Sequence, residues 1–304
     1  DSGSAVQSQM GQVVITNSEI LYNYGVTSGA LAIAEGSEFQ IDNCWFEGNS
    51  VYNPENENWS SGGALNISTI SGSIRNSFFI GNSAGRGAAI SGWSSDHNTI
   101  LIEKCVFEDN IGIEAGAAVF SFFNVEVVTS EFVNNTVTGS DGGGGGAISL
   151  QSGDLRVVES EFIGNSSAAR GLAIAASDEN YEYTVHIEQS LFDGNFSTSS
   201  EDSGTVNIHA FEGMEVQESI FSNNVGGGLT VSKTDGMTFQ TDFIGNTEGS
   251  ALVFDGAGAN GEGYVINTRF IDNINASTGM GLAGGLFVMG TDIFVYNAVF
   301  ENNY

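Results

Sequence analysis

The sequence predicts an all-β protein, a single-stranded right-handed parallel β-helix (β-solenoid) of about ten coils. Three observations carry this prediction: a repeated Phe-x-x-Asn tetrapeptide, a Gly-Ala motif in most gaps between its copies, and a third short apolar stretch before many of them. Successive Phe residues are 22 residues apart at the closest, Phe221 to Phe243, and 33 at the widest, Phe46 to Phe79. We expect one continuous β-helix domain over residues 1–304.

The Phe-x-x-Asn tetrapeptide supplies the Phe and the Asn of each predicted packing unit, and a Gly-Ala corner completes it. Its Phe residues are Phe46, Phe79, Phe107, Phe132, Phe162, Phe192, Phe221, Phe243, Phe270 and Phe300. Its Asn residues are Asn49, Asn82, Asn110, Asn135, Asn165, Asn195, Asn224, Asn246, Asn273 and Asn303. Residues 20–23 form a degenerate further copy with Ile in place of Phe.

Strand alternation predicts that these Phe residues point inward. Residues i and i+2 of a strand face the same way, so Ser160 and Phe162 should both point to the core. The Phe rings should then stack along the axis at about 4.8 Å per coil. We expect each ladder Asn to adopt left-handed backbone angles and to pair its amide with the Asn of the next coil.

The other two motifs complete the coil. GGALNI from Gly62 and GGAISL from Gly145 place a Gly corner before a strand, with Ile148 and Leu150 facing inward. Apolar stretches such as LRVV from Leu155 precede many of the Phe residues. Each coil therefore has three short strands bounded by Gly, Asn, Asp or Ser. The density of Gly and β-branched residues argues against helices.

The paired Phe-x-x-Asn and Gly-Gly-Ala-[Ile/Leu/Val] motifs resemble the repeats of chlamydial polymorphic outer membrane proteins and of related algal β-helix surface proteins. The resemblance spans nearly the whole chain. It implies a right-handed β-helix and a surface location. It does not imply one activity, because such helices serve adhesins, filaments and polysaccharide-cleaving enzymes.

The charge balance limits the partners. The chain carries 7 Lys+Arg against 37 Asp+Glu, a formal charge of −30, which excludes nucleic acid as an expected partner. No apolar run of about 18 residues predicts a transmembrane helix. The chain starts at Asp1 rather than Met, and we expect it to be a segment of a longer, extracellular or cell-surface protein.

Cys44 and Cys105 each precede a ladder Phe by two residues, the position that Ser77 fills in the coil between them. Two coils separate the cysteines by about 9 to 10 Å, which exceeds the reach of a disulfide. We expect both to be small inward residues that are not bonded to each other.

Asn-x-Ser/Thr sequons mark candidate glycosylation sites. Asn165 and Asn195 are ladder residues that should be buried. The remaining candidates are expected on outward or loop positions, namely Asn58, Asn66, Asn134 and Asn275.

No arrangement of charged residues predicts an active site or a cofactor. Glu131 and Glu161 should lie about 5 Å apart on adjacent coils, either as part of a solvated acidic face or as a weak calcium site. His186 and His209 fall on different strands, and His97 falls in a loop. We expect no enzyme activity and no resident metal.

The sequence thus predicts a non-enzymatic, acidic structural or adhesive module of a cell-surface protein or filament, with glycoprotein character. Expected partners are other copies or segments of the same protein, end to end, and a carbohydrate or cell-surface ligand. The alternatives are a carbohydrate-binding or polysaccharide-cleaving β-helix and a calcium-dependent adhesin. Carboxylates and aromatic residues gathered in one groove would favour carbohydrate.

Overall fold

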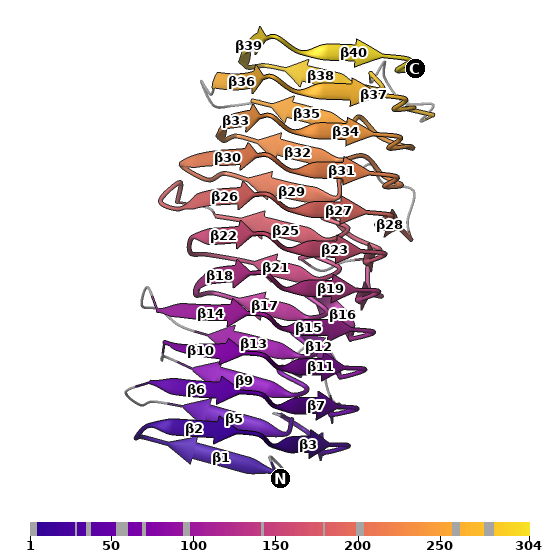
Figure 1. Ribbon diagram of the computed structural model, residues 1–304. Helices are drawn as coiled ribbons and strands as arrows, with labels where there is room; N and C mark the ends of the chain where they lie inside the picture. The colour runs from indigo at the N-terminus through magenta and orange to yellow at the C-terminus, as the bar shows by residue number, and fades with distance from the viewer. Residues whose placement is uncertain are drawn as a thin grey trace.

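The computed structural model is a parallel β-solenoid that stacks its coils along one axis (Figure 1). The structure describes residues 5–27, 29–34, 38–52, 60–68, 71–93, 98–140, 143–178, 180–198, 204–256, 262–276 and 283–304. Within these ranges there is no helix, and so none that could cross a membrane. The predicted all-β class and parallel β-helix are confirmed.

Three sheets of eleven strands and one of seven make up the solenoid, and every strand pair is parallel. Sheet A consists of β1 (Val6–Gln9), β5 (Leu31–Ala34), β9 (Leu65–Ser68), β13 (Ile90–Trp93), β17 (Val119–Ser121), β21 (Ile148–Leu150), β25 (Ile174–Ser177), β29 (Val206–His209), β32 (Leu229–Ser232), β35 (Leu252–Asp255) and β38 (Leu286–Met289). Sheet B consists of β2 (Val13–Thr16), β6 (Phe39–Asp42), β10 (Gly72–Arg75), β14 (Thr99–Glu103), β18 (Asn124–Val128), β22 (Leu155–Val158), β26 (Thr184–Glu188), β30 (Gly213–Gln217), β33 (Asp235–Phe239), β36 (Glu262–Ile266) and β39 (Asp292–Tyr296).

Sheet C consists of β3 (Glu19–Leu21), β7 (Trp45–Glu47), β11 (Phe78–Ile80), β15 (Val106–Glu108), β19 (Glu131–Val133), β23 (Glu161–Ile163), β27 (Leu191–Asp193), β31 (Ile220–Ser222), β34 (Asp242–Ile244), β37 (Arg269–Ile271) and β40 (Val299–Glu301). Sheet D consists of β4 (Tyr24–Gly25), β8 (Ser50–Val51), β12 (Ser83–Arg86), β16 (Ile111–Ala115), β20 (Thr136–Val137), β24 (Ser166–Ser167) and β28 (Phe196–Ser197). The degenerate copy at residues 20–23 supplies β3, so each large sheet has one strand more than there are complete Phe-x-x-Asn repeats.

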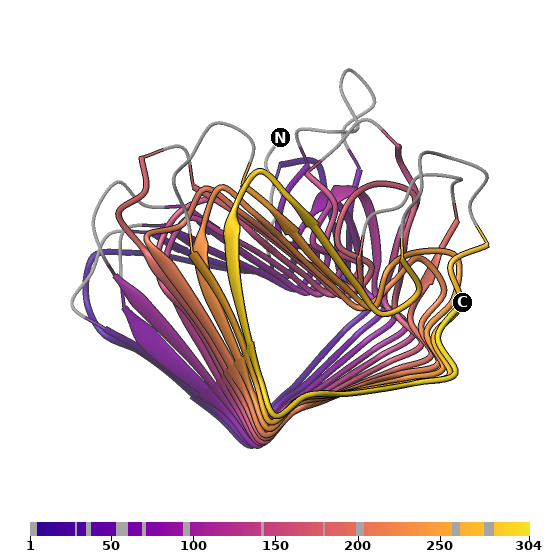
Figure 2. The ribbon, with the colours of Figure 1, turned by 90° about the horizontal axis from the view of Figure 1, so that it is seen from above.

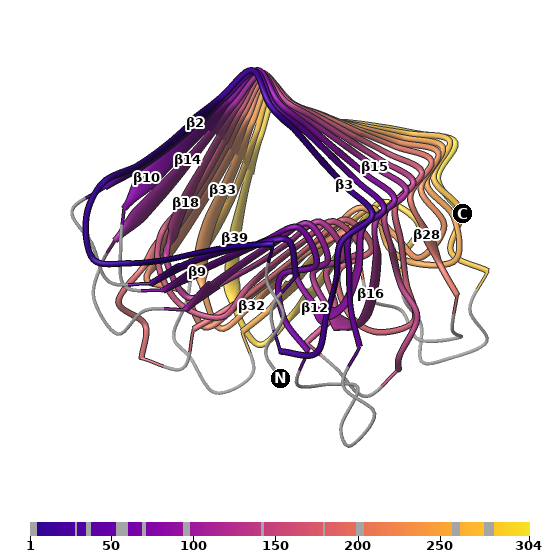
Figure 3. The same ribbon diagram turned by 90° about the horizontal axis from the view of Figure 1, so that it is seen from below.

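Sheets A, B and C form the sides of a triangular cross-section (Figures 2 and 3). Seen from the C-terminal end, the chain winds counterclockwise as it comes toward the viewer, which is the right-handed sense (Figure 2). Sheet D lies beside the triangle, next to the corner where sheet C ends (Figure 3).

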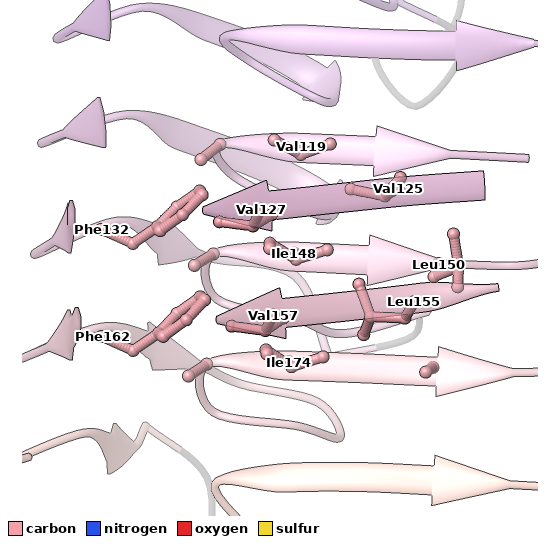
Figure 4. Packing of buried hydrophobic residues seen from close by; sticks show 14 of the residues in the cluster. Val119, Val125, Val127, Phe132, Ile148, Leu150, Leu155, Val157, Phe162 and Ile174 are labelled. Atoms are coloured by element: carbon pink, nitrogen blue, oxygen red, sulfur yellow. The ribbon is translucent and has the colours of Figure 1, made fainter. Parts of the chain in front are cut away.

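Inward columns of side chains from all three sheets fill the triangle (Figure 4). Ile148 of sheet A, Val157 of sheet B and Phe162 of sheet C are fully buried and repeat at the matching positions of neighbouring coils. Leu150 and Ser160 are buried as well, at 0% and 1% exposure, as the alternation predicts.

The corners correct one expectation. The ladder Asn residues do not adopt left-handed angles; the residue immediately before each one does, as at Gly164 with φ 62° and Asn134 with φ 54°. The ladder Asn instead has an inward amide, and Gly, Asn or Asp before it makes the turn.

A second left-handed corner joins sheets B and C at the sharp vertex of the triangle (Figure 2). It is occupied in every coil, by Asn17, Asn43, Asn76, Lys104, Thr129, Glu159, Gln189, Glu218, Gln240, Asn267 and Asn297. The Gly corner before sheet A is left-handed too: Gly145 has φ 74°, and an added Cβ would lie 2.0 Å from the carbonyl oxygen of Ile148. That position therefore requires glycine.

Candidate functional site

The ten ladder Phe residues form one continuous stack inside sheet C. Every consecutive pair from Phe46 to Phe300 has ring centroids 4.7 to 5.2 Å apart with nearly parallel planes. Phe46 to Phe270 are fully buried, whereas Phe300 of the last coil is 51% exposed. The stack therefore stabilises the interior and offers no binding surface between its ends.

The ladder Asn residues are joined by side-chain amides. The Asn165 amide nitrogen donates to Asn195 Oδ1 at 3.1 Å and to the carbonyl oxygen of Phe132 at 2.8 Å. Asn165 Oδ1 in turn accepts from the backbone and amide nitrogens of Asn135. The same pattern begins at Asn23 and reaches Asn303. Its buried polar groups are satisfied within the ladder, which is a structural role.

The cysteines occupy a Ser/Cys/Thr column on the inner side of the B–C vertex. The backbone N–H of Cys44 donates to Ser77 Oγ at 3.1 Å, and that of Cys105 donates to Ser130 Oγ at 3.1 Å. Both cysteines are buried and free, with the coil of Ser77 between them. Burial raises the pKa of the Cys105 thiol to about 12.

The sequon residues differ in exposure. Asn134 is exposed, whereas Asn66 and Asn275 are half-buried and Asn58 lies outside the described residues, as does His97. Asn66 donates to the carbonyl oxygen of Ser61 at 3.4 Å. Asn165 and Asn195 are fully buried.

Glu131 and Glu161 are directly opposite each other on the outer face of β19 and β23, and both are exposed. In the part of the chain that the structure describes, no three His, Cys, Asp or Glu residues are arranged to hold a metal ion.

A hollow on the outer face of the solenoid crosses strands β26, β30, β33 and β36 of sheet B. This sheet B groove has a volume of about 500 Å³, within the range of about 300–1,000 Å³ typical of ligand pockets. Its lining residues are Thr184, Val185, His186, Gly213, Met214, Glu215, Asp235, Gly236, Met237, Glu262 and Tyr264. Gly213 helps to open it, because the Cβ that it lacks would meet no atom within 4 Å.

One border of the groove is an aromatic surface. Tyr264 of β36 is opposite Phe294 of β39, and their rings stack with centroids 5.1 Å apart and planes 17° apart. Met237 precedes Tyr264 in the same outward column. The Tyr264 hydroxyl donates to Glu262 Oε2 at 2.5 Å, which raises the pKa of the phenol, and this bond holds the ring in place.

Three carboxylates, Glu215, Asp235 and Glu262, also line the groove. His186 lies 3.4 Å from Glu215 through Nδ1 and 3.4 Å from Glu188 through Nε2, so its ring is held between two acidic side chains. On the neighbouring strands β33 and β36, Asp235 Oδ1 accepts the backbone N–H of Glu262 at 2.9 Å. The groove thus combines a stacked aromatic surface with hydrogen-bond acceptors.

Sequence reasoning missed this groove. The outward positions of the last three sheet B strands carry Phe239, Tyr264, Phe294 and Tyr296, where a solvated face would carry polar residues. That departure from polar alternation was the available signal. The prediction that His186 and His209 fall on different strands is confirmed, because His186 lies on β26 of sheet B and His209 ends β29 of sheet A.

Searches against protein-family models, curated proteins and solved structures found no match to this chain.

Proposed function

We propose that the chain is a non-enzymatic structural or adhesive β-helix module of an extracellular or cell-surface protein or filament, and that its sheet B groove binds neutral carbohydrate. The observation that carries this proposal is the stacked pair Tyr264–Phe294 beside Glu262 on an open face. Other copies or segments of the same protein are the proposed structural partners.

The interior supports the structural part of the proposal. The Phe stack and the Asn ladder connect each coil to the next along most of the chain, so bending the solenoid would disturb both at once. Such a rod holds outward side chains at set intervals, which suits a spacer or a display surface.

The groove supports the adhesive part. The apolar faces of sugar rings pack well on exposed aromatic rings, and carboxylates accept hydrogen bonds from sugar hydroxyl groups. Glu215, Asp235 and Glu262 would repel an acidic polysaccharide, which is why we propose a neutral one.

The repeats support the proposed location. The Phe-x-x-Asn and Gly-Gly-Ala motifs resemble those of chlamydial and algal β-helix surface proteins, and we propose that this chain serves at a cell surface as they do. A charge of −30 favours an aqueous, salt-containing medium for such a surface.

The test is calorimetric titration with neutral oligosaccharides, such as glucan, galactan and mannan hexasaccharides. Phe294→Ala should weaken binding about tenfold, the effect of about 1.4 kcal/mol of lost stacking. Phe78→Ala is the matched control. Phe78 is 38% exposed, almost the same as Phe294 at 37%, and its ring also stacks on an aromatic neighbour, Trp45, at 4.8 Å. It lies on sheet C, away from the sheet B groove.

Equal losses in the two variants, or no binding of any neutral oligosaccharide, would contradict the proposed carbohydrate site. Release of new reducing ends from the oligosaccharides, abolished by Glu215→Gln or Glu262→Gln, would show that the protein is the polysaccharide-cleaving alternative.

A further inference from the structure

A second hollow lies on a different side of the solenoid, over strands β21, β25 and β29 of sheet A. This sheet A groove has a volume of about 330 Å³ and is bordered by Ser140 and Gly143 on one segment and by Ala169 and Arg170 on another. Its size is at the lower end of ligand pockets, so it suits a small group rather than a long chain.

Small side chains open the floor of this groove. Ala175 of β25 lies between Ser149 and Asn207 of the adjacent strands in one outward column. Because its side chain is a single methyl group, it leaves space above the sheet at that point. Ser177 and His209 are opposite each other in the next outward column. The floor is therefore polar on both sides of Ala175.

The cations at this groove differ from the other basic residues of the chain. Five basic residues are in ion pairs with neighbouring carboxylates: Arg75, Arg86, Lys104, Arg156 and Arg269. Among the described residues Arg170 and Lys233 are in no ion pair, and Arg170 borders the groove. In a chain of −30 net charge, Arg170 is thus a cation that borders a hollow without being in an ion pair with a described carboxylate.

Arg170 and Lys233 act on the same side chain. Burial lowers the pKa of His209, and the charges of Lys233 and Arg170 lower it further, while Asp255 opposes them. Lys233 follows β32 directly, and Ser232 of that strand is opposite His209. Arg170 therefore lines the groove directly, and Lys233 is next in sequence to the residue opposite His209, which also lines it.

We propose that the sheet A groove binds the anionic group of a saccharide, a sulfate ester or a carboxylate, through Arg170 and Lys233. The planar guanidinium of Arg170 can donate two parallel hydrogen bonds to such a group, and Lys233 adds a point charge. This site goes beyond the proposed function, because its charge preference is opposite to that of the sheet B groove.

The acidic surroundings decide how such a ligand binds. With 37 Asp+Glu over the whole chain, a polyanion lying along the rod would be repelled by most of the surface. The groove therefore takes one charged terminal or branch unit. An anionic end group and a neutral chain could then be bound on separate sides of one rod.

The experiment compares three forms of one sugar by calorimetric titration of the whole chain: galactose 6-sulfate, galacturonic acid and galactose. We expect at least one of the charged forms to bind about tenfold more tightly than galactose, because hydrogen bonds to ionised groups are stronger than neutral ones. The two charged forms distinguish a sulfate ester from a carboxylate as the preferred group.

Arg170→Gln and Lys233→Gln should each weaken binding of the charged form about tenfold. Arg156→Gln is the matched control, because Arg156 pairs with Glu126 at 2.6 Å on sheet B, and this variant should leave binding unchanged. The thermal unfolding midpoints of all three variants show whether the solenoid is intact.

Two results would overturn the proposal: equal binding of the charged and neutral sugars, or folded Arg170→Gln and Lys233→Gln variants that bind the charged sugar as the unmodified chain does. The two grooves share no lining residue. Failure of the sheet B groove to bind neutral oligosaccharides would therefore not affect the binding of charged sugars at the sheet A groove.

Discussion

Phe132 and Phe162, opposite residues of β19 and β23, stack with their ring centroids 4.7 Å apart and their planes 1° apart. The distance equals the spacing of neighbouring strands, so the rings repeat at the interval of the backbone. Phe162 stacks in the same way on Phe192 at 4.8 Å. Each interior ladder ring therefore contacts two others. Removing one such ring leaves a cavity between two remaining rings.

We predict that Phe162→Ala lowers the free energy of unfolding by about 3–5 kcal/mol, because a fully buried Phe is replaced by a cavity. Ile163→Ala, at a half-buried outward position of the same strand, should cost far less. Chemical denaturation of both variants measures the difference. Equal losses would mean that the inward register of β23 is wrong.

The Asn ladder should be about as sensitive to substitution. Asn165→Ala removes the partner of the Phe132 carbonyl and of the Asn135 amide, and each buried group left unpaired costs about 1–3 kcal/mol. The control is Asn134→Gly, because Asn134 is exposed and its φ of 54° suits glycine. If urea titration showed the same midpoint for both variants, the amide ladder would not be stabilising the coils.

Cys105 should make stability depend on pH in the alkaline range. Its pKa is about 12 in the folded chain against 9.0 for an unperturbed thiol, so the unfolded chain loses this proton first. The contribution is complete below about pH 9 and is lost as pH rises toward 12, at up to about 1.4 kcal/mol per pH unit.

Cys105→Ser is the comparison for this effect, because serine stands at the equivalent positions Ser77 and Ser130. Denaturation under reducing conditions at a series of alkaline pH values should show a steeper loss for the unmodified chain than for the variant. Parallel pH profiles would exclude Cys105 as the cause.

Among the candidate glycosylation sites we predict that Asn134 is modified most completely when the chain is secreted from a eukaryotic cell, because it is the exposed one of the three described. Asn165 and Asn195 should stay unmodified, since a glycan on either amide would break the buried ladder. Glycopeptide mass spectrometry reports the occupancy of each site. A glycan at Asn165 would contradict the ladder geometry.

Calcium should have little effect on stability. Glu131 and Glu161 supply two exposed carboxylates, fewer ligands than the six to eight oxygens that calcium takes. We expect the thermal unfolding midpoint to be the same in EDTA and in millimolar calcium. A rise with calcium that disappears in Glu131→Gln would instead favour the calcium-dependent adhesin.

The sequence by itself determined which way each strand faces. At residues 160–163, Ser and Phe alternate with Glu and Ile, and only one register buries both Ser160 and Phe162. Recurrence of the tetrapeptide then implied that equivalent residues stack, because adjacent coils of one solenoid repeat the same corners. The core and its two ladders therefore followed from local patterns.

The tertiary structure decided the vertex between sheets B and C and the two grooves. Lys104, Thr129 and Glu159 adopt left-handed angles without a glycine or asparagine to signal them, because strand pairing on both sides holds the corner closed. Tyr264 meets Phe294, and Arg170 approaches His209, only through the pairing of different coils. The segments between strands differ in length from coil to coil, so sequence spacing does not show which outward side chains become neighbours. Those neighbours are set by the hydrogen-bonded register of the stacked coils.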